Sequence, residues 1–305
     1  MGLIEAKQNF LGQELTLVSD PDLEDPFSRW LRRPGWKAED HTTLAALLTE
    51  EDDLIIDLGA NYGTFFLPVC LKTGAKCIAV EALRANVEVL AQAITANNLN
   101  ARTNVVHAAV MGETGTVHIA GDSAYASIRD EGEEVKAITL DYIDLHHDLT
   151  GLSLVKMDIE GCELETLEAA DAFFEKHTSV SFIFEANGAH SFKKKHLPQD
   201  LLRIFERWGY EIYLVRKGRC VRRSSSDFQE AGLSDYFATK KPLDESVLQG
   251  FSFEDFSDDE VFDATVFTLT QMKAGYKESA MQQMHLAPDW LKERLRQASV
   301  LSDET

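Results

Sequence analysis

The stretch that most constrains the fold is Asp53-Leu-Ile-Ile-Asp57-Leu-Gly59-Ala-Asn61-Tyr-Gly63. A short apolar run ends in an acid, small residues follow, and an amphipathic helical pattern then begins. This order predicts a buried strand, a tight glycine turn and a helix start, the first unit of a nucleotide-type α/β fold. The spacing is neither G-x-G-x-x-G nor a P-loop, which argues against a bound pyrophosphate. The turn suits a ligand with a small cationic or zwitterionic group, and by itself it leaves several cofactors open.

A second apolar strand is predicted over Lys76–Glu81, and it also ends in an acid. Glu81 follows the glycine turn by about 20 residues, where a carboxylate can accept both hydrogen bonds of a ribose diol. The same pattern of an apolar run closed by an acid returns at Asp158 and Glu185. One such acid is explained by helix capping. Four of them at one sheet edge favour a ligand that carries an ammonium, a diol and a sulfonium.

Strands and helices alternate along most of the chain at the spacing of parallel βαβ units, which predicts a doubly wound, mostly parallel α/β sheet of seven strands. An antiparallel pair at 115–120 and 134–139 interrupts this rhythm, and the loop 121–127 between them is expected over the pocket mouth. Three segments are predicted: an N-terminal segment packed on the core (1–50), the ligand-binding domain (51–242) and an acidic helical C-terminal extension (243–305). The extension is interpreted either as a docking, dimerisation or lid element or as helices packed on the core.

Composition limits the class of partner. The chain has 305 residues with 51 acidic and 30 basic side chains, a formal net charge of −21. Such a charge repels phosphates, so a nucleic acid partner is not expected; the basic residues between Arg203 and Arg223 form the only candidate patch. No apolar run approaches the roughly 20 residues of a membrane span, so no membrane partner is expected either.

The cysteines favour a reducing compartment. They show no C-x-x-C pair and no metal-ligand spacing with histidine, so buried thiols and a cytoplasmic protein are expected. The N-terminus lacks the charged region and apolar core of a signal peptide. His146-His147 has no acidic partner at ligand spacing, and no metal site is predicted. The cysteines are Cys70, Cys77, Cys162 and Cys220.

The sequence resembles the FkbM-like family of S-adenosylmethionine-dependent methyltransferases (class I), between about residues 54 and 213. The most specific block is Val155-Lys-Met-Asp158-Ile-Glu160-Gly161-Cys-Glu163-Leu-Glu165. Two departures are Ala82, where such proteins often carry proline, and the tail beyond 243, which is not part of the family pattern. The other matching motifs are Ile56-Asp-Leu-Gly-Ala-Asn-Tyr-Gly63, Val80-Glu81, His107-Ala-Ala-Val110 and Thr139-Leu-Asp141.

The resemblance implies S-adenosyl-L-methionine as the cofactor and assigns roles to residues. The turn from Asp57 to Gly63 would wrap the methionine part, and Glu81 would hold the ribose hydroxyls. His107 and Ala108 would border the adenine. Asp158 would lie near the methionine ammonium and the reacting methyl, with Glu160 close by. The complete set of implied cofactor-binding residues is Asp57, Gly59, Ala60, Asn61, Tyr62, Gly63, Glu81, Ala82, His107, Ala108 and Asp158.

The resemblance also implies methylation of a hydroxyl on a sugar, glycan or secondary metabolite. An alcohol benefits from a base within hydrogen-bond reach, and the candidate catalytic residues are Asp158, Glu160, Glu185 and His190, the last in a loop after the fifth strand. Two alternatives remain: N-methylation of a peptide or other acceptor, and a non-catalytic binding or scaffold protein that keeps the fold. The expected partners are a small-molecule or glycan acceptor and a second copy of the chain through the C-terminal extension.

Overall fold

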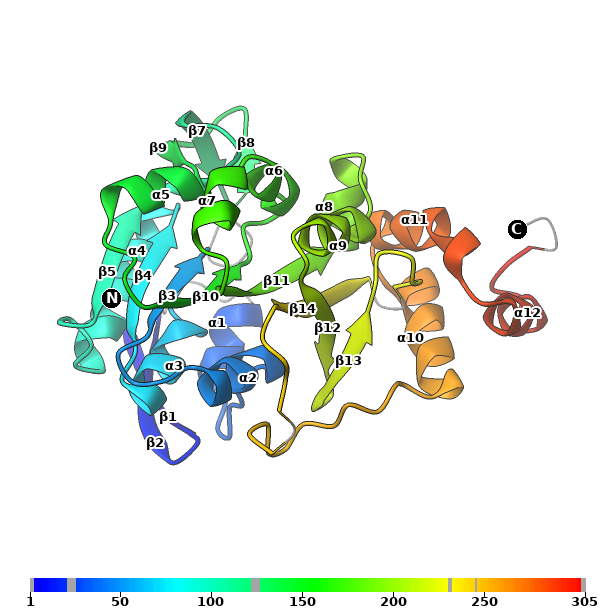
Figure 1. Ribbon diagram of the computed structural model, residues 1–305, viewed down its shortest axis with the longest axis horizontal. Coiled ribbons are helices and arrows are strands. Elements are labelled where there is room, and N and C mark those ends of the chain that lie inside the picture. Colours follow the sequence, from blue (N-terminus) through cyan, green and yellow to red (C-terminus); the bar gives the residue numbers. More distant parts are fainter. Residues whose placement is uncertain (1–2, 21–25, 122–126, 230–231, 245, 303–305) are drawn as a thin grey trace. The chain divides into compact units, whose positions relative to one another are not determined.

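The computed structural model describes residues 3–20, 26–121, 127–229, 232–244 and 246–302. The chain divides into two compact units, Met1–Phe182 and Ile183–Thr305 (Figure 1). This division falls inside the predicted domain 51–242, so the three predicted segments stay a prediction. Within the described residues, no helix is both long enough and apolar enough to cross a membrane.

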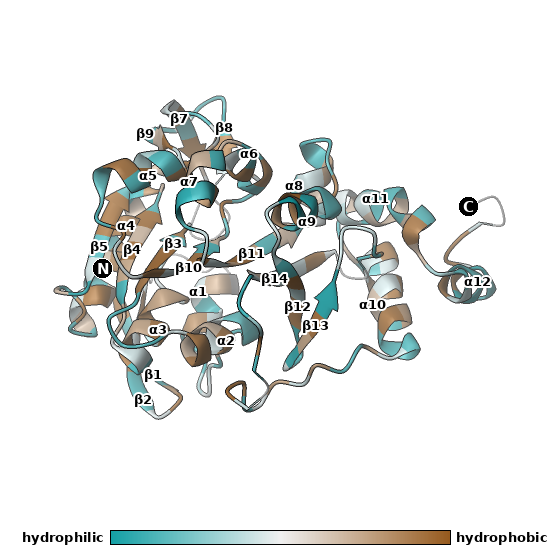
Figure 2. Ribbon diagram, viewed as in Figure 1, coloured by the Kyte–Doolittle hydropathy of each residue, from teal (hydrophilic) through white to brown (hydrophobic). Residues whose placement is uncertain are grey.

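Unit 1 is built on four parallel strands in the spatial order β10-β3-β4-β5, flanked by helices (Figure 1). Every residue of β3 is buried, as expected of a parallel strand covered on both faces, and this agrees with its apolar colour in Figure 2. The predicted α/β class and its parallel sheet are confirmed. The strands are β3 (Leu54–Leu58), β4 (Lys76–Glu81), β5 (Thr103–His107) and β10 (Leu152–Met157). The helices of this part of the unit are α3 (Phe66–Thr73), α4 (Arg84–Ala96), α5 (Leu140–His146), α6 (Glu163–Glu168) and α7 (Asp171–Lys176).

The helix predicted after β10 is interrupted, because α6 and α7 are separate elements. The side chain of Asp141 accepts a hydrogen bond from the backbone N–H of Phe173 at 3.1 Å, which supplies a partner near the start of α7 that a continuous helix would not need. The predicted cap of α5 is present: Thr139 Oγ1 accepts from the N–H of Tyr142 at 3.0 Å.

A second, smaller sheet in unit 1 has the order β6-β9-β7-β8. Its antiparallel β7–β9 pair corresponds to the predicted pair at 115–120 and 134–139. The predicted third strand, 104–110, is divided: β5 pairs with β4, whereas β6 pairs with β9. Most of the predicted loop 121–127 lies outside the described residues. The strands are β6 (Ala109–Val110), β7 (Gly115–Ala120), β8 (Ser127–Arg129) and β9 (Glu133–Ile138).

The N-terminal part of unit 1 is a hairpin followed by two helices. The side chain of Asn97, at the end of α4, accepts from the N–H of Thr16 at 2.8 Å and donates to the carbonyl of Thr16 at 2.7 Å. These two buried bonds connect the second strand of the hairpin to the helix. The elements are β1 (Ile4–Phe10), β2 (Gln13–Ser19), α1 (Pro26–Leu31) and α2 (Asp40–Leu48).

Unit 2 contains four strands in the order β13-β12-β14-β11, with β12 antiparallel to both of its neighbours. Among the described residues the large sheet therefore has eight strands where seven were predicted, and β13 is the additional one. Its arginines belong to the candidate basic patch of the sequence, and the strand is mostly hydrophilic (Figure 2). The elements are β11 (Ser181–Asn187), α8 (Gly188–Lys193), α9 (Pro198–Arg207), β12 (Glu211–Arg216), β13 (Arg219–Arg223) and β14 (Leu233–Thr239).

The C-terminal helices of unit 2 form their own apolar cluster. Leu291 and Leu295 of α12 are fully buried there, together with Phe228 and Met284. The helix predicted over 261–280 is two helices that meet at Met272-Lys273. The elements are α10 (Asp258–Gln271), α11 (Ala274–Gln282), the 3₁₀ turn η2 (Met284–Leu286) and α12 (Asp289–Gln297).

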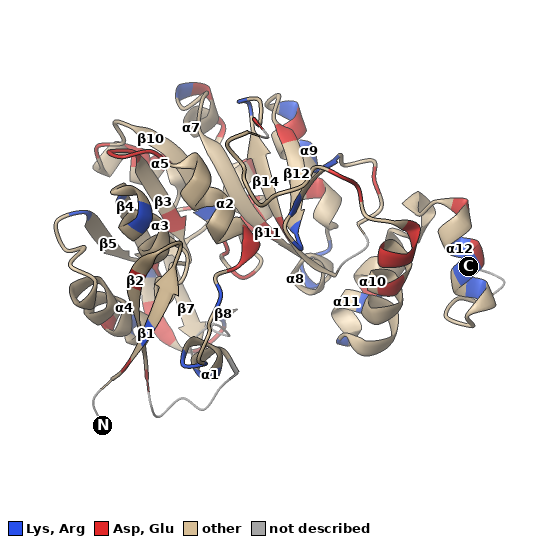
Figure 3. Cartoon of the chain, turned by 90° about the horizontal axis from the view of Figure 1, so that it is seen from below, with Lys and Arg blue, Asp and Glu red and all other residues tan. Residues whose placement is uncertain are grey.

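An extended segment, here called the strap (residues 251–257), lies along β13. The N–H of Cys220 donates to the carbonyl of Ser252 at 2.8 Å, and the N–H of Ser252 donates to the carbonyl of Gly218 at 2.9 Å. These bonds satisfy backbone groups at the edge of the sheet. Acidic residues follow at the start of α10 (Figure 3).

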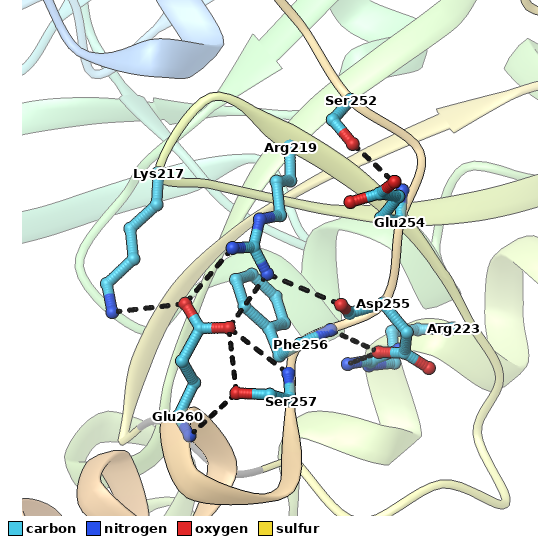
Figure 4. Close-up of polar contacts among 9 residues, drawn as sticks. All are labelled: Lys217, Arg219, Arg223, Ser252, Glu254, Asp255, Phe256, Ser257 and Glu260. Atoms are coloured by element: carbon cyan, nitrogen blue, oxygen red, sulfur yellow. Dashed lines mark hydrogen bonds and ion pairs between the residues drawn. The ribbon is translucent and has the colours of Figure 1, made fainter.

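The strap is anchored by one aromatic ring. Phe256 is buried, and the guanidinium carbons of three arginines lie near its ring; Figure 4 draws two of these, Arg219 and Arg223. Their distances from the ring centroid are 4.5 Å for Arg216, 4.9 Å for Arg219 and 6.0 Å for Arg223. Arg219 also donates two hydrogen bonds to Glu260, at 2.9 and 3.2 Å. Lys217, Arg219 and Arg223 therefore form ion pairs with acidic residues 255 and 260 of the same chain.

Candidate functional site

The glycine turn closes directly against the loop that follows β10. Gly59 has φ +80°, and a β-carbon on it would lie 1.9 Å from the carbonyl oxygen of Asp158. The N–H groups of Gly59 and Ala60 both donate to the carbonyl of Val80 at 2.9 Å. The turn therefore brings together the carboxyl ends of β3, β4 and β10, the edge where open α/β sheets bind ligands.

Asp57 is a fully buried carboxylate whose two oxygens accept no hydrogen bond from the described residues. Burial raises the pKa of Asp57 to about 6; Lys156 opposes this rise, and the negative charges of Asp158 and Glu81 add to it. A buried acceptor without a hydrogen bond is costly, which makes it a candidate for a partner that a ligand supplies.

Lys156 is the cation of the site. Its Nζ donates to Oδ2 of Asp158 at 3.2 Å and lies 3.8 Å from Oδ1 of Asp57. The lysine was part of the quoted motif, but no role was assigned to it. A lysine inside an otherwise apolar strand was the available signal, since charged residues are buried only when they are paired.

Glu81 is held by three donors of the protein itself. Oε1 accepts from the N–H of Leu83 at 2.8 Å and from Nδ2 of Asn86 at 3.2 Å, while Oε2 accepts from the N–H of Asn61 at 2.8 Å. Burial raises the pKa of Glu81, and these hydrogen bonds counteract the rise. The backbone N–H of Ala82 is a further hydrogen-bond donor to Glu81, so the protein itself uses most of the roughly four acceptor positions of this carboxylate.

Glu160 lies in a tight loop after β10 with φ +55°, a conformation that non-glycine residues rarely adopt. Burial and the nearby charges of Asp158 and Glu163 raise the pKa of Glu160 to about 8. Glu163, which is not among the site residues predicted from the sequence, stabilises this loop. Its Oε1 accepts from the N–H of Ile159 at 2.9 Å and from the N–H of Gly161 at 3.3 Å.

The end of β5 lies beside the second strand acid. The N–H of Ala108 donates to the carbonyl of Glu81 at 3.1 Å, and Nε2 of His107 lies 3.0 Å from the carbonyl of Ala82. Nε2 of His107 is also 3.6 Å from Oε1 of Glu133. Three of the predicted cofactor-binding residues, His107, Ala108 and Ala82, are therefore adjacent.

Tyr62, by contrast, contributes its ring to packing. It is 1% exposed, and its ring centroid lies 5.7 Å from that of Phe27. The neighbouring Gly63 closes the turn by donating its N–H to the carbonyl of Ala60 at 2.8 Å. Any contact of this part of the turn with a ligand would involve the backbone.

Glu185 and His190, the remaining candidates, belong to unit 2. His190 was expected in a loop but lies in helix α8. The reason is local: Asn187 caps this helix, its Oδ1 accepting from the N–H groups of Ala189 at 3.1 Å and His190 at 3.2 Å. Nδ2 of Asn187 donates to Glu185 at 3.4 Å. The structure thus gathers Asp57, Glu81, Asp158 and Glu160 in unit 1, and Glu185 and His190 in unit 2.

In the described part of the chain, no group of three or more His, Cys, Asp or Glu side chains could hold a metal ion. All four cysteines are buried. Burial raises the pKa of Cys70 to about 12, which keeps this thiol protonated and unreactive.

The sequence profile described as "Methyltransferase FkbM domain" matches residues 57–212, just over half of the 305 residues. This region contains the turn, both strand acids and the complete block after β10. No curated protein sequence matches the chain.

Several solved structures are similar in fold. Methyltransferase FkbM from Methylobacillus flagellatus KT is 19% identical with a TM-score of 0.43, over 62% of this chain and 44% of that chain, so the chain spans less than half of its length. TYW2 of M. jannaschii in complex with AdoMet is 14% identical with a TM-score of 0.40, over 77% and 84% of the two chains. An O-methyltransferase from Bacillus cereus in complex with SAH is 12% identical with a TM-score of 0.38, over 65% and 78%.

Proposed function

The chain belongs to the FkbM methyltransferase family, and we propose that it transfers the methyl group of S-adenosylmethionine to a hydroxyl of a small molecule or glycan. The observation that carries the cofactor assignment is Asp57. A fully buried carboxylate without a hydrogen-bond donor among the described residues fits a cofactor that brings positive charge to this edge of the sheet.

The other acidic residues at this edge of the sheet support the cofactor assignment. The charges of Asp158 and Glu81 raise the pKa of both Asp57 and Glu160, and Lys156 is the cation that opposes both rises. The site thus has a surplus of negative charge that the ammonium and sulfonium of the cofactor would offset. Asp57 and Asp158 would bind the methionine end, and the backbone of Gly59 and Ala60 would lie against it.

Glu81 would face the ribose, but the protein already uses most of its acceptor positions. Three of the acceptor positions of Glu81 are used by Leu83, Asn86 and Asn61. The backbone N–H of Ala82 also donates to this carboxylate, so Glu81 has little capacity left to accept from both ribose hydroxyls, as the sequence suggested it would. His107 and Ala108 at the end of β5 would border the adenine.

The bound cofactor would supply an electrophilic methyl group on its sulfonium. The chain's contribution is to hold an acceptor in line with that methyl and to exclude water. An alcohol must also lose its proton as the new bond forms. Of the candidate bases in unit 1, Glu160 fits best, because its raised pKa of about 8 lies close to neutral pH. Its unfavourable φ, +55°, is the kind of backbone strain that clusters at functional sites.

Calorimetry with S-adenosylmethionine and S-adenosylhomocysteine tests the cofactor assignment. We expect micromolar binding by the wild type and at least about tenfold weaker binding by Asp57→Asn, because an amide cannot offset a cation. Glu88→Gln, an exposed substitution on α4 with the same change of charge, is the matched control. No binding of either compound to the wild type would overturn the proposal. The acceptor class would then be found by mass spectrometry of cell extract incubated with enzyme and methyl-labelled cofactor.

A further inference from the structure

Lys156 occupies an unusual position for a lysine. It lies on β10 directly opposite Asp57 in the register of the β10–β3 pair, so both side chains share one face of the sheet. Only 10% of its side chain is exposed. Its ammonium lies near two carboxylates, 3.2 Å from Oδ2 of Asp158, which directly follows β10, and 3.8 Å from Oδ1 of Asp57 on β3.

The charged neighbours keep this lysine ionised. Burial alone would lower the pKa of Lys156, but the carboxylates of Asp158 and Asp57, with a smaller contribution from Glu39, raise it above its ordinary value. Lys156 therefore remains an ammonium throughout the physiological range of pH. A buried charge of this kind is retained only with compensating partners, and here the partners are two proposed cofactor ligands.

Asp57 depends on Lys156 more than Asp158 does. Asp158 is 37% exposed at its side chain and is solvated from the open side, whereas Asp57 is fully buried. The titratable groups around Asp57 are Lys156, Asp158, Glu81 and His41, with the thiols Cys70 and Cys77 beside it. Of these charged groups, Lys156 has the largest effect on the pKa of Asp57, and it is the only lysine or arginine among them.

We propose that Lys156 is a positioning residue that holds Asp57 and Asp158 as a charged pair of acceptors for the cationic end of the cofactor. Lys156 would act from its position on β10, beside the cofactor site and not in the space that the cofactor would fill. This inference rests on the proposed function. It adds Lys156, which would affect cofactor binding through the carboxylates of Asp57 and Asp158.

The consequence is a specific pH dependence. In the wild type, the pKa of Asp57 is about 6, so Asp57 is charged above that pH. Without the ammonium of Lys156, only the smaller effect of His41 opposes desolvation and the like charges of Asp158 and Glu81, so Asp57 keeps its proton at neutral pH. A protonated Asp57 cannot offset the cofactor's charge, and binding would recover only when alkaline pH removes that proton.

The experiment measures the dissociation constant of S-adenosylhomocysteine between pH 5.5 and 9 for the wild type, Lys156→Met and Lys156→Arg. We expect the wild type to lose affinity only below about pH 6, and Lys156→Met to bind at least about tenfold more weakly at pH 7 and to recover at alkaline pH, with the profile displaced by about one unit or more. Lys156→Arg keeps the positive charge and should keep the wild-type profile. Circular dichroism melts verify that each variant is folded.

Two results would overturn the inference while leaving the proposed function intact: wild-type affinity in Lys156→Met, or a loss that is equal at every pH, which indicates a structural role alone. If Lys156→Met does not fold, Lys156→Gln provides the test, because it also removes the ammonium and should displace the profile toward alkaline pH, and an unmoved profile contradicts the inference. A wild type that binds neither S-adenosylmethionine nor S-adenosylhomocysteine would instead refute the proposed function.

Discussion

Gly59 and Asp158 come into contact through their backbones: a β-carbon on Gly59 would lie 1.9 Å from the carbonyl oxygen of Asp158. The two residues follow β3 and β10, which are paired strands. The contact fixes the separation of two loops that together hold the proposed methionine site. A substitution at Gly59 must therefore move one loop, the other, or both.

Gly59→Ala should destabilise the protein through this contact. Gly12 offers a matched control, because its φ of +86° is close to the +80° of Gly59 while nothing lies within 4 Å of its hypothetical β-carbon. Gly12→Ala should cost about 1–2 kcal/mol of unfolding free energy from the backbone conformation alone. Gly59→Ala should cost about 1–3 kcal/mol more, from steric overlap. Equal losses in urea denaturation would contradict a role of this contact.

Glu163→Gln should stabilise the protein in a pH-dependent manner. Burial raises the pKa of Glu163 from 4.5 to about 7, so the folded chain binds this proton more tightly than the unfolded chain. The bound proton of Glu163 contributes fully to the free energy of unfolding below about pH 4.5, and this contribution is lost as the pH rises through 7. A neutral glutamine can still accept from Ile159 and Gly161, and it should be more stable than the wild type by on the order of 2 kcal/mol at pH 8.5.

The two proteins should have equal stability near pH 4. Urea denaturation at both pH values makes this comparison. A Glu163→Gln variant that is less stable than the wild type at pH 8.5 would show that the carboxylate charge itself is needed by the loop.

Glu81→Gln should weaken both the fold and cofactor binding. Glu81 accepts three hydrogen bonds from Asn61, Leu83 and Asn86, and one nitrogen of glutamine would face at least one of these donors. A lost bond of this kind costs about 1–3 kcal/mol when the donor stays buried. Thermal melts and calorimetry on the same samples separate the two effects, with Glu88→Gln as the control. Unchanged values of both quantities would be incompatible with the described geometry.

Glu160→Gln distinguishes the class of acceptor. If Glu160 is the base for an alcohol, kcat should fall by about 10²–10⁴-fold while cofactor binding changes far less. The rate of the wild type should rise with pH through about 8, as Glu160 loses its proton. A neutral amine needs no base, so retained activity in Glu160→Gln would favour N-methylation. Once an acceptor is known, steady-state kinetics decides between these outcomes.

Phe256→Ala should destabilise unit 2. The ring is 6% exposed and lies under three guanidinium groups, so its removal eliminates apolar burial and cation–π contacts together. A loss of about 3 kcal/mol is expected in urea denaturation. Phe267→Ala removes a ring that is 58% exposed and should change stability far less. Equal effects of the two substitutions would argue against the anchoring role of Phe256.

The strand-end acids could be located from the sequence because the pattern is local: an apolar run followed by Asp57, or by Glu81, specifies the end of a buried strand. The roles of Lys156 and Glu163 were not accessible in this way. Both are buried charged groups, and their placement follows from strand register and loop geometry, which are tertiary properties.

The elements that were missed have a related explanation. β1 and β13 are short and mostly polar, so they lack an apolar periodicity, although β13 forms a local hairpin with β12. His190 was assigned to a loop because a six-residue helix such as α8 has too few residues to show a 3.6-residue period, and Asn187 starts this helix without a following apolar face.

The strap sets the minimum length of a fragment that can be expressed on its own. The family match ends at residue 212, but β13 and the strap that covers its edge lie beyond that point. A recombinant fragment ending at residue 242 would lack Ser252 and Phe256, leaving the N–H of Cys220 and the carbonyl of Gly218 without these partners at a sheet edge. Such an edge promotes self-association, so the fragment should precipitate or oligomerise where the longer chain stays dispersed. Expression vectors for this protein should therefore extend through α10.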